Sequence, residues 1–178
     1  ANIGEKPVIV VPDPFAPIGS SADVSFVTTK TTWKTDPKKS HINVVVCDSD
    51  WEAEFCRVVE KNSHVLTYVK NQGLGFEVPY NDGHVSRHYR PDFIVRINDG
   101  NAEPLNLVVE IKGYRKEDAK AKAETMRTLW IPGVNHLGTC GRWAFEEFKD
   151  VFEIEDKFHE LVDRLRAAAK TTKTTEAA

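Results

Sequence analysis

Two short apolar segments separated by a turn sequence constrain the fold of this chain more than any other feature. Residues 92–97 are Asp-Phe-Ile-Val-Arg-Ile and residues 105–111 are Leu-Asn-Leu-Val-Val-Glu-Ile, so both are rich in apolar and β-branched side chains. Between them, residues 98–101 are Asn-Asp-Gly-Asn, which favours a turn. The two segments are therefore predicted to form a β-hairpin with buried strands.

Further elements are predicted on both sides of this hairpin. Strands are expected at residues 42–47, 65–69, 76–80 and 143–148. Helices are expected at residues 49–62, from Gly113 to Pro132-Gly133, and after residue 148. In the last helix one face carries Ile154, Phe158, Leu161 and Leu165. The resulting order is β-α-β-β-β-α-β-α. This order predicts an α/β fold with a central mixed β-sheet flanked by helices.

Composition divides the chain into an arm, a body and a tail. Residues 1–40 hold five of the nine prolines and a Thr-rich run, which favours an irregular arm, although residues 7–11 and 24–27 are each capable of adding a short strand. Residues 41–169 form the predicted globular body. Residues 170–178 are polar and are predicted to be a disordered tail.

The overall composition excludes several classes of protein. With 178 residues, of which 40% are hydrophobic and 29% are charged, the chain is long enough for one globular domain. No segment approaches the roughly 18 consecutive apolar residues of a membrane span, so no membrane partner is expected. Its three cysteines lack CxxC spacing, which predicts neither a disulfide framework nor a zinc site and favours a cytoplasmic location.

Charged side chains interrupt the predicted hairpin at one end. Asp92 begins the first strand, and Glu110 and Lys112 end the second. Because side chains alternate along a strand, Glu110 and Lys112 project from the same face, and Asp92 on the paired strand can reach that face. Two carboxylates of this kind suit Mg²⁺, which can acidify a water molecule and neutralise charge on a phosphodiester, while the lysine orients the water. This arrangement predicts hydrolytic nuclease chemistry.

As a bare pattern, Pro-Asp followed by (D/E)xK has little specificity. Pro12-Asp13 is a second Pro-Asp, and other acid-x-lysine pairs are Asp36/Lys38, Asp118/Lys120, Glu147/Lys149 and Glu155/Lys157. Only Asp92 with Glu110 and Lys112 lies on adjacent apolar strands, where a charged residue requires a reason. The alternative interpretation is a structural ion pair between Lys112 and either acid.

The motif and its surroundings resemble a known family. The segments that carry the resemblance are Ser40-His41-Ile42-Asn43, Asp50-Trp51-Glu52, Tyr68-Val69-Lys70-Asn71, residues 75–80 (Gly-Phe-Glu-Val-Pro-Tyr), residues 90–95 (Arg-Pro-Asp-Phe-Ile-Val), residues 109–114 (Val-Glu-Ile-Lys-Gly-Tyr) and residues 130–135 (Trp-Ile-Pro-Gly-Val-Asn). Together they resemble the C-terminal endonuclease domain of the restriction (Res) subunit of Type III restriction enzymes, which has a PD-(D/E)xK restriction-endonuclease-like fold.

The resemblance implies a site, a cofactor and partners. It implies catalytic Asp92, Glu110 and Lys112, and a metal site for Mg²⁺, with Mn²⁺ as a substitute, at Asp92, Glu110 and Ile111. It also implies double-stranded DNA as substrate, a helicase-like ATPase region of the same subunit that uses ATP, and a modification methyltransferase subunit. Neither motor nor methyltransferase motifs occur here, so the arm is expected to connect the nuclease domain to an absent motor.

Accessory residues are expected around this set. Glu52 matches the acid that this superfamily often supplies from its first helix, but Ser49-x-x-Glu52 also has the spacing of a capping box, and both interpretations stay open. Lys122 resembles the family's basic residue near the scissile phosphate. Arg115 and Arg90 are further candidates for DNA contacts. Because the net charge is −3, the domain is expected to rely on other parts of the enzyme for DNA capture.

Two other functions share part of this evidence. One is a nuclease-like module that has lost its chemistry and serves to dock or hold DNA. The other is a PD-(D/E)xK repair or recombination nuclease, which would prefer junctions or ends over duplex. Metal binding followed by an assay for plasmid cleavage separates the first from an active enzyme.

Overall fold

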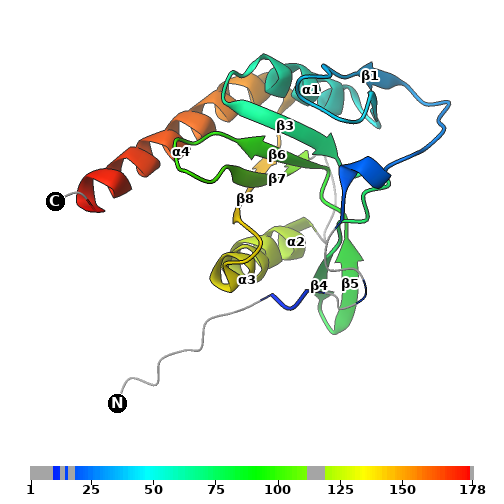
Figure 1. Cartoon of the computed structure of the whole chain (residues 1–178). Coiled ribbons are helices and arrows are strands. Elements are labelled where there is room, and N and C mark those ends of the chain that lie inside the picture. The colour runs from blue at the N-terminus through cyan, green and yellow to red at the C-terminus, as the bar shows by residue number, and fades with distance from the viewer. Residues whose placement is uncertain (1–9, 13–14, 16–18, 112–118, 177–178) are drawn as a thin grey trace.

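The hairpin expected from the sequence forms the centre of the fold in the computed structural model (Figure 1), which describes residues 10–12, 15, 19–111 and 119–176. Strand β6 (Phe93–Ile97) pairs antiparallel with β7 (Leu105–Ile111). In this register Phe93 lies opposite Val109 and Ile97 opposite Leu105. The prediction of a hairpin at this position is confirmed.

Two more strands complete the central sheet. Strand β3 (Val65–Lys70) pairs antiparallel with β6, and β8 (Arg142–Phe148) pairs parallel with β7, which gives the strand order β3-β6-β7-β8. The sheet is therefore mixed. Together with the helices on its two faces, it confirms the predicted α/β fold with a central mixed sheet.

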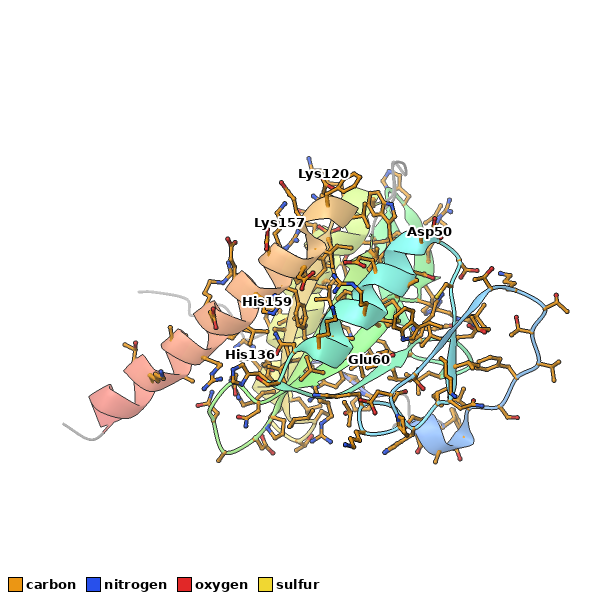
Figure 2. All side chains as sticks on the ribbon, turned by 90° about the horizontal axis from the view of Figure 1, so that it is seen from above. Asp50, Glu60, Lys120, His136, Lys157 and His159 are labelled. Carbon is orange, nitrogen blue, oxygen red and sulfur yellow. The ribbon has the colours of Figure 1, made fainter. Side chains whose placement is uncertain are left out.

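Helices α1 (Asp50–Lys61) and α4 (Ile154–Glu176) cover one face of this sheet. In Figure 2 they lie side by side across it, with Asp50 and Glu60 near opposite ends of α1. The core on this face is dominated by four fully buried phenylalanines, namely Phe55, Phe93, Phe148 and Phe158. The ring centroid of Phe55 lies 5.0 Å from that of Phe93, 5.7 Å from Phe148 and 5.8 Å from Phe158. Phe55 thus joins α1 to two strands and to α4.

A continuous helical segment and a separate hairpin pack on the other face. The segments are α2 (Ala119–Thr125), a π-helical turn η2 (Met126–Trp130), α3 (Ile131–Leu137), and the hairpin of β4 (Val78–Asp82) with β5 (Val85–Tyr89). Their shared apolar cluster comprises Val78, Tyr80, Tyr89, Val108 and Met126. The strand expected at residues 76–80 therefore belongs to a hairpin outside the central sheet.

The prediction that the helix ends at Pro132-Gly133 is wrong. The chain stays helical to Leu137 and ends at Gly138, whose φ is 71°. In the π-helical turn the N–H of Ile131 donates to the carbonyl of Met126, so the regular ladder is already broken before Pro132. Pro132 then lies in the first turn of α3, where a missing N–H costs little.

The arm and the tail differ from the sequence expectation in detail. The arm carries a 3-10 turn η1 (Ser21–Asp23) and strand β1 (Thr32–Lys34), which pairs antiparallel with β2 (Val44–Val46) in a small sheet of its own. Residues 24–27 are not a strand, and residues 7–9 lie outside the described part of the chain.

At the other end of the chain, a 3-10 turn η3 (Val151–Glu153) leads into α4. This helix continues to Glu176, into the region expected to be a disordered tail. Among the described helices, none combines the length and apolar character needed to cross a bilayer. The predicted division into arm, body and tail stays a prediction.

The position of Phe55 generates a test of the core. Phe55→Ala should lower the free energy of unfolding by about 3–5 kcal/mol, because it leaves a cavity between two strands and α4. The measurement is urea denaturation followed by circular dichroism. Phe152→Ala is the matched control, since Phe152 is 92% exposed and its removal should change stability by less than about 0.5 kcal/mol. Equal effects of the two substitutions would contradict this packing.

Candidate functional site

Four strand ends meet at one edge of the central sheet. The carboxyl ends of β3, β7 and β8 and the start of β6 lie there, as their pairing requires. These ends carry Lys70, Asp92, Glu110 and Glu147, and α1 begins beside them with Glu52. The edge therefore gathers four acids and a lysine from five elements.

Asp92 and Glu110 lie at the same end of the hairpin. The paired residues Phe93 and Val109 are one step away, so the same register places Asp92 opposite Glu110. Asp92 is fixed at the end of β7, because its Oδ2 accepts the main-chain N–H of Ile111 at 2.7 Å. The structure thus brings together two of the three residues of the predicted catalytic set. Lys112 lies outside the described residues, as does Arg115.

The environment of Asp92 raises its pKa to about 6. Burial of the carboxylate is the largest cause, and the negative charges of Glu52 and Asp48 add to it. The N–H of Ile111 and the ammonium of Lys70 act in the opposite direction, but they do not compensate for burial. An ionised Asp92 is therefore held in a place where its charge is costly, which favours binding of a cation.

The buried side chain of Tyr89 lies beside these acids. Its pKa is raised by burial and by the charges of Glu110, Glu147 and Asp92, in that order. Lys122 lies over two tyrosine rings, with Nζ 5.5 Å from the ring centroid of Tyr80 and 5.7 Å from that of Tyr89. The predicted DNA-contacting Lys122 thus lies against the tyrosine that adjoins the acidic edge.

Glu147 is a residue of this edge that sequence reasoning missed. It lies directly opposite Glu110 in the parallel β7–β8 register, and its side chain is 2% exposed. Arg127 of the π-helical turn donates to its carboxylate at 2.9 Å, and Lys149 lies 3.8 Å away. The pair Glu147/Lys149 was visible in the sequence, but only the long-range pairing of β8 with β7 shows that Glu147 belongs here.

The capping-box interpretation of Glu52 is wrong in its geometry. Ser49 is the N-cap of α1, but its side chain makes no capping hydrogen bond. Glu52 bonds instead to the residue before Ser49, since its Oε2 accepts the main-chain N–H of Asp48 at 2.6 Å. The same oxygen accepts from Lys70 Nζ at 2.7 Å. Glu52 is therefore an ion-paired residue beside Asp92 and not a conventional helix cap.

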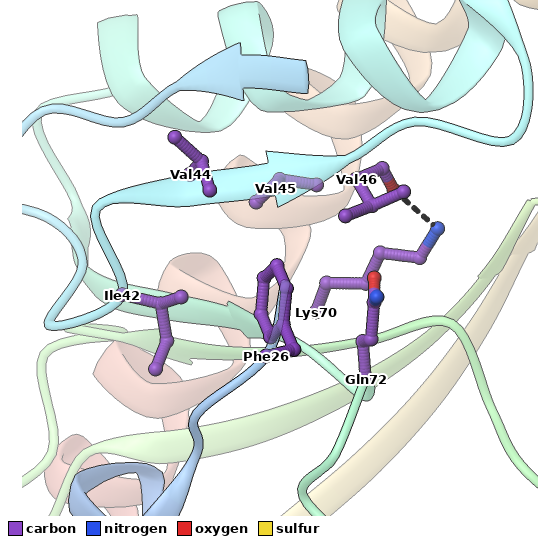
Figure 3. A pocket seen from close by; sticks show the side chains of 7 residues that line it. All are labelled: Phe26, Ile42, Val44, Val45, Val46, Lys70 and Gln72. Carbon is purple, nitrogen blue, oxygen red and sulfur yellow. Dashed lines mark hydrogen bonds between the residues drawn. The ribbon is translucent and has the colours of Figure 1, made fainter. Parts of the chain in front are cut away.

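Lys70 is the second residue that the sequence did not single out. It extends from the end of β3 beneath β2, as Figure 3 shows, and its side chain is 10% exposed. Nζ donates to the carbonyl of Val46 at 2.7 Å, to Asp48 Oδ2 at 3.0 Å and to Glu52 Oε2 at 2.7 Å. Burial lowers the pKa of Lys70, but these carboxylates outweigh burial and leave the pKa above its ordinary value.

Arg90 is an exposed residue two positions before Asp92. Its Nε donates to Glu77 Oε1 at 2.8 Å, and its side chain is 67% exposed. The structure thus places this predicted DNA-contacting residue at the surface, in an ion pair with Glu77. Exposed pairs of this kind contribute little to stability, so Arg90 can exchange its partner for a phosphate at low cost.

Comparison with known families gives one match. The sequence matches the family described as "Endonuclease domain" over residues 38–155, about two thirds of its length. The chain belongs to this endonuclease family. The matched region contains Glu52, Asp92, Glu110, Lys112 and Lys122. No curated protein and no solved structure matches the chain.

The acids of this endonuclease domain fit a hard divalent cation. Among the described residues there is no group of three or more His, Cys, Asp or Glu side chains arranged to hold a metal ion. Mg²⁺ does not need one, because it is usually bound by one or two carboxylates, with water and substrate phosphate completing its octahedron. Asp92, which directly precedes β6, and Glu110 near the end of β7 can supply those carboxylates.

The raised pKa of Asp92 predicts a pH-dependent stability. The folded protein binds this proton more tightly than the unfolded chain does, so the stabilisation is complete below about pH 4 and is lost as the pH rises through about 6. Asp92→Asn should remove this loss and stabilise the metal-free protein at pH 7.5 by up to about 3 kcal/mol relative to wild type. The Asn side chain keeps an oxygen for the N–H of Ile111.

The measurement is urea denaturation of both proteins in chelator at pH 4.0 and 7.5. Asp156→Asn, at an exposed position of α4, is the control and should follow the wild type at both pH values. A constant difference in stability between Asp92→Asn and wild type across this range would contradict the assigned cause.

Proposed function

We propose that this chain is a Mg²⁺-dependent endodeoxyribonuclease domain that hydrolyses DNA phosphodiester bonds with Asp92, Glu110 and Lys112. The observation that carries the proposal is the placement of Asp92 opposite Glu110 at one edge of the sheet, in a member of an endonuclease family. Hydrolysis of a phosphodiester needs charge neutralisation at the phosphate and an activated water molecule. Bound Mg²⁺, held by Asp92, Glu110 and the main chain of Ile111, would supply both.

The residues of this chain have separate tasks in the proposed reaction. The N–H of Ile111 fixes the Asp92 carboxylate at the end of β7, so that it is oriented before a cation arrives. Lys112, two residues after Glu110 in the sequence, would orient the water or stabilise charge on the phosphorus. Arg127 neutralises Glu147 next to Glu110, which limits the repulsion of the DNA backbone by this edge.

DNA is expected to approach over Tyr80 and Tyr89. Lys122 lies above both rings, and Arg115 and Arg90 are the further proposed phosphate contacts. The chain as a whole carries a net charge of −3, which is unfavourable for independent DNA capture. We therefore propose that other parts of the enzyme bring the DNA to this domain.

The finer assignment rests on the resemblance described above. We propose the restriction subunit of a Type III restriction enzyme, in which a helicase-like ATPase motor of the same subunit and a modification methyltransferase subunit control cleavage. The cytoplasmic location expected from the cysteine content belongs to the same proposal. In such an enzyme the nuclease domain cuts, while sequence recognition resides in the other subunit.

Glu110→Gln and Asp92→Ala should abolish cleavage of plasmid DNA in the intact enzyme that contains this chain. Each substitution removes one of the two facing carboxylates while leaving the distant core unchanged. ATP hydrolysis and assembly with the modification subunit should be retained. The measurement is the conversion of supercoiled plasmid to nicked and linear forms in Mg²⁺, with ATP hydrolysis followed in parallel.

Glu160→Gln on the exposed face of α4 is the control and should cleave as the wild type does. Cleavage retained in either Asp92→Ala or Glu110→Gln would exclude this site. Binding of Mn²⁺ by a wild-type enzyme that never cuts would favour the DNA-holding module instead. A preference for junctions or ends over duplex would favour the repair nuclease.

A further inference from the structure

The hydrogen-bonding capacity of the Lys70 ammonium is filled. Its three N–H groups have three acceptors, the carbonyl of Val46 and the carboxylates of Asp48 and Glu52, at 2.7, 3.0 and 2.7 Å. Lys70 and Glu52 are both nearly buried, with side chains 10% and 8% exposed. A buried ammonium with three oxygen acceptors, two of them from carboxylates, resembles a bound cation in both charge and coordination.

This ammonium lies close to the proposed metal site. Lys70 is the direct partner of Phe93 in the β3–β6 register, and Asp92 precedes Phe93. The next residue of the chain, Asn71, donates its N–H to the carbonyl of Asp92 at 2.8 Å. The charges of Glu52 and Asp48 raise the pKa of Asp92, and the charge of Lys70 lowers it. Lys70 therefore binds Glu52 of α1 through its side chain and adjoins the start of β6, next to Asp92, through its main chain.

We infer that Lys70 is a positioning residue that takes the place of a second metal ion, so that this site binds one divalent cation, at Asp92 and Glu110, and Glu52 serves as the counterion of Lys70. This inference rests on the proposed function, because it concerns the cation of that site. It assigns Glu52 an indirect role through Lys70 and excludes it as a metal ligand.

Charge and burial explain why a second divalent ion is disfavoured. An ion at Glu52 would have to displace Lys70 Nζ and leave a nearly buried ammonium without its carboxylate partner, which is strongly unfavourable. If Lys70 stayed, the two cations would repel each other at short range. Asp48 offers no better site, since Lys70 binds its Oδ2 at 3.0 Å and a second cation there would meet the same repulsion.

The test is the stoichiometry of Mn²⁺ binding to the full chain, measured by isothermal titration calorimetry without DNA. Wild type should bind one Mn²⁺. Lys70→Met, which keeps most of the side-chain volume, should bind two, because Glu52 and Asp48 lose their internal cation. Lys70→Met combined with Glu52→Gln should return to one. Two ions in the wild type, or a single ion in Lys70→Met, would overturn the inference.

A separate variant distinguishes failure of the inference from failure of the proposed function. Glu110→Gln should weaken the single Mn²⁺ of the wild type by more than about a hundredfold if Glu110 is a ligand. If Lys70→Met combined with Glu110→Gln still binds one Mn²⁺, the new ion is located at Glu52, as inferred. If Lys70→Met gains an ion but Glu110→Gln loses none, Lys70 does exclude an ion from Glu52, whereas the proposed metal site at Glu110 is wrong.

A second variant keeps the inference testable if Lys70→Met does not fold. Glu52→Gln retains Lys70 and should leave the stoichiometry at one, with an affinity loss below about tenfold from the missing negative charge. Loss of Mn²⁺ binding as complete as that in Glu110→Gln would make Glu52 a ligand and overturn the inference.

Discussion

The antiparallel pairing of β6 with β7 is the constraint on which both the core and the site depend. In the observed register Phe93, Val95 and Ile97 pack with the core beneath α1 and α4, and Asp92 falls opposite Glu110 at the end of the hairpin. A slip of one residue would turn all three apolar side chains to the other face. The burial of large apolar side chains therefore fixes the relative position of two carboxylates, and stability of the fold and geometry of the site are set by the same contacts.

The fold must also accommodate several acids at one partly buried edge. Glu52 is compensated by Lys70 from β3, and Glu147 by Arg127 from the π-helical turn. Asp92 differs, because a main-chain N–H is its hydrogen-bond donor and its pKa stays raised. Internal cations thus balance the flanking acids Glu52 and Glu147, whereas the hydrogen-bond donor of Asp92 is a main-chain group. This difference supports the proposed binding of a cation at Asp92.

Local patterns predicted what depends on neighbours in sequence, and long-range contacts decided the rest. The β6–β7 hairpin and α1 follow from alternation, turn residues and helical period, so the sequence predicts that Asp92 and Glu110 converge. Predicting that Glu147 belongs to the site requires the parallel pairing of β8 with β7. Predicting the same for Lys70 requires the contact between β3 and the start of α1. The capping-box interpretation of Glu52 is wrong for the same reason, since a lysine distant in sequence binds its carboxylate. The predicted helix end at Pro132 is wrong because the preceding π-helical turn cannot be recognised from a 3.6-residue period.

The two lysines that bind Asp48 differ in how deeply they are buried. Lys30, from the arm, and Asp48 have side chains 65% and 55% exposed, so their ion pair contributes about 0–1 kcal/mol and weakens with salt. Lys70 and Glu52 are nearly buried, and breaking that pair would leave an uncompensated charge in the interior. The Lys30 side chain can therefore leave Asp48 with little effect on the inner pair. The charge balance around Asp92 consequently depends on the central sheet and α1, and it depends little on the contact between Lys30 and Asp48.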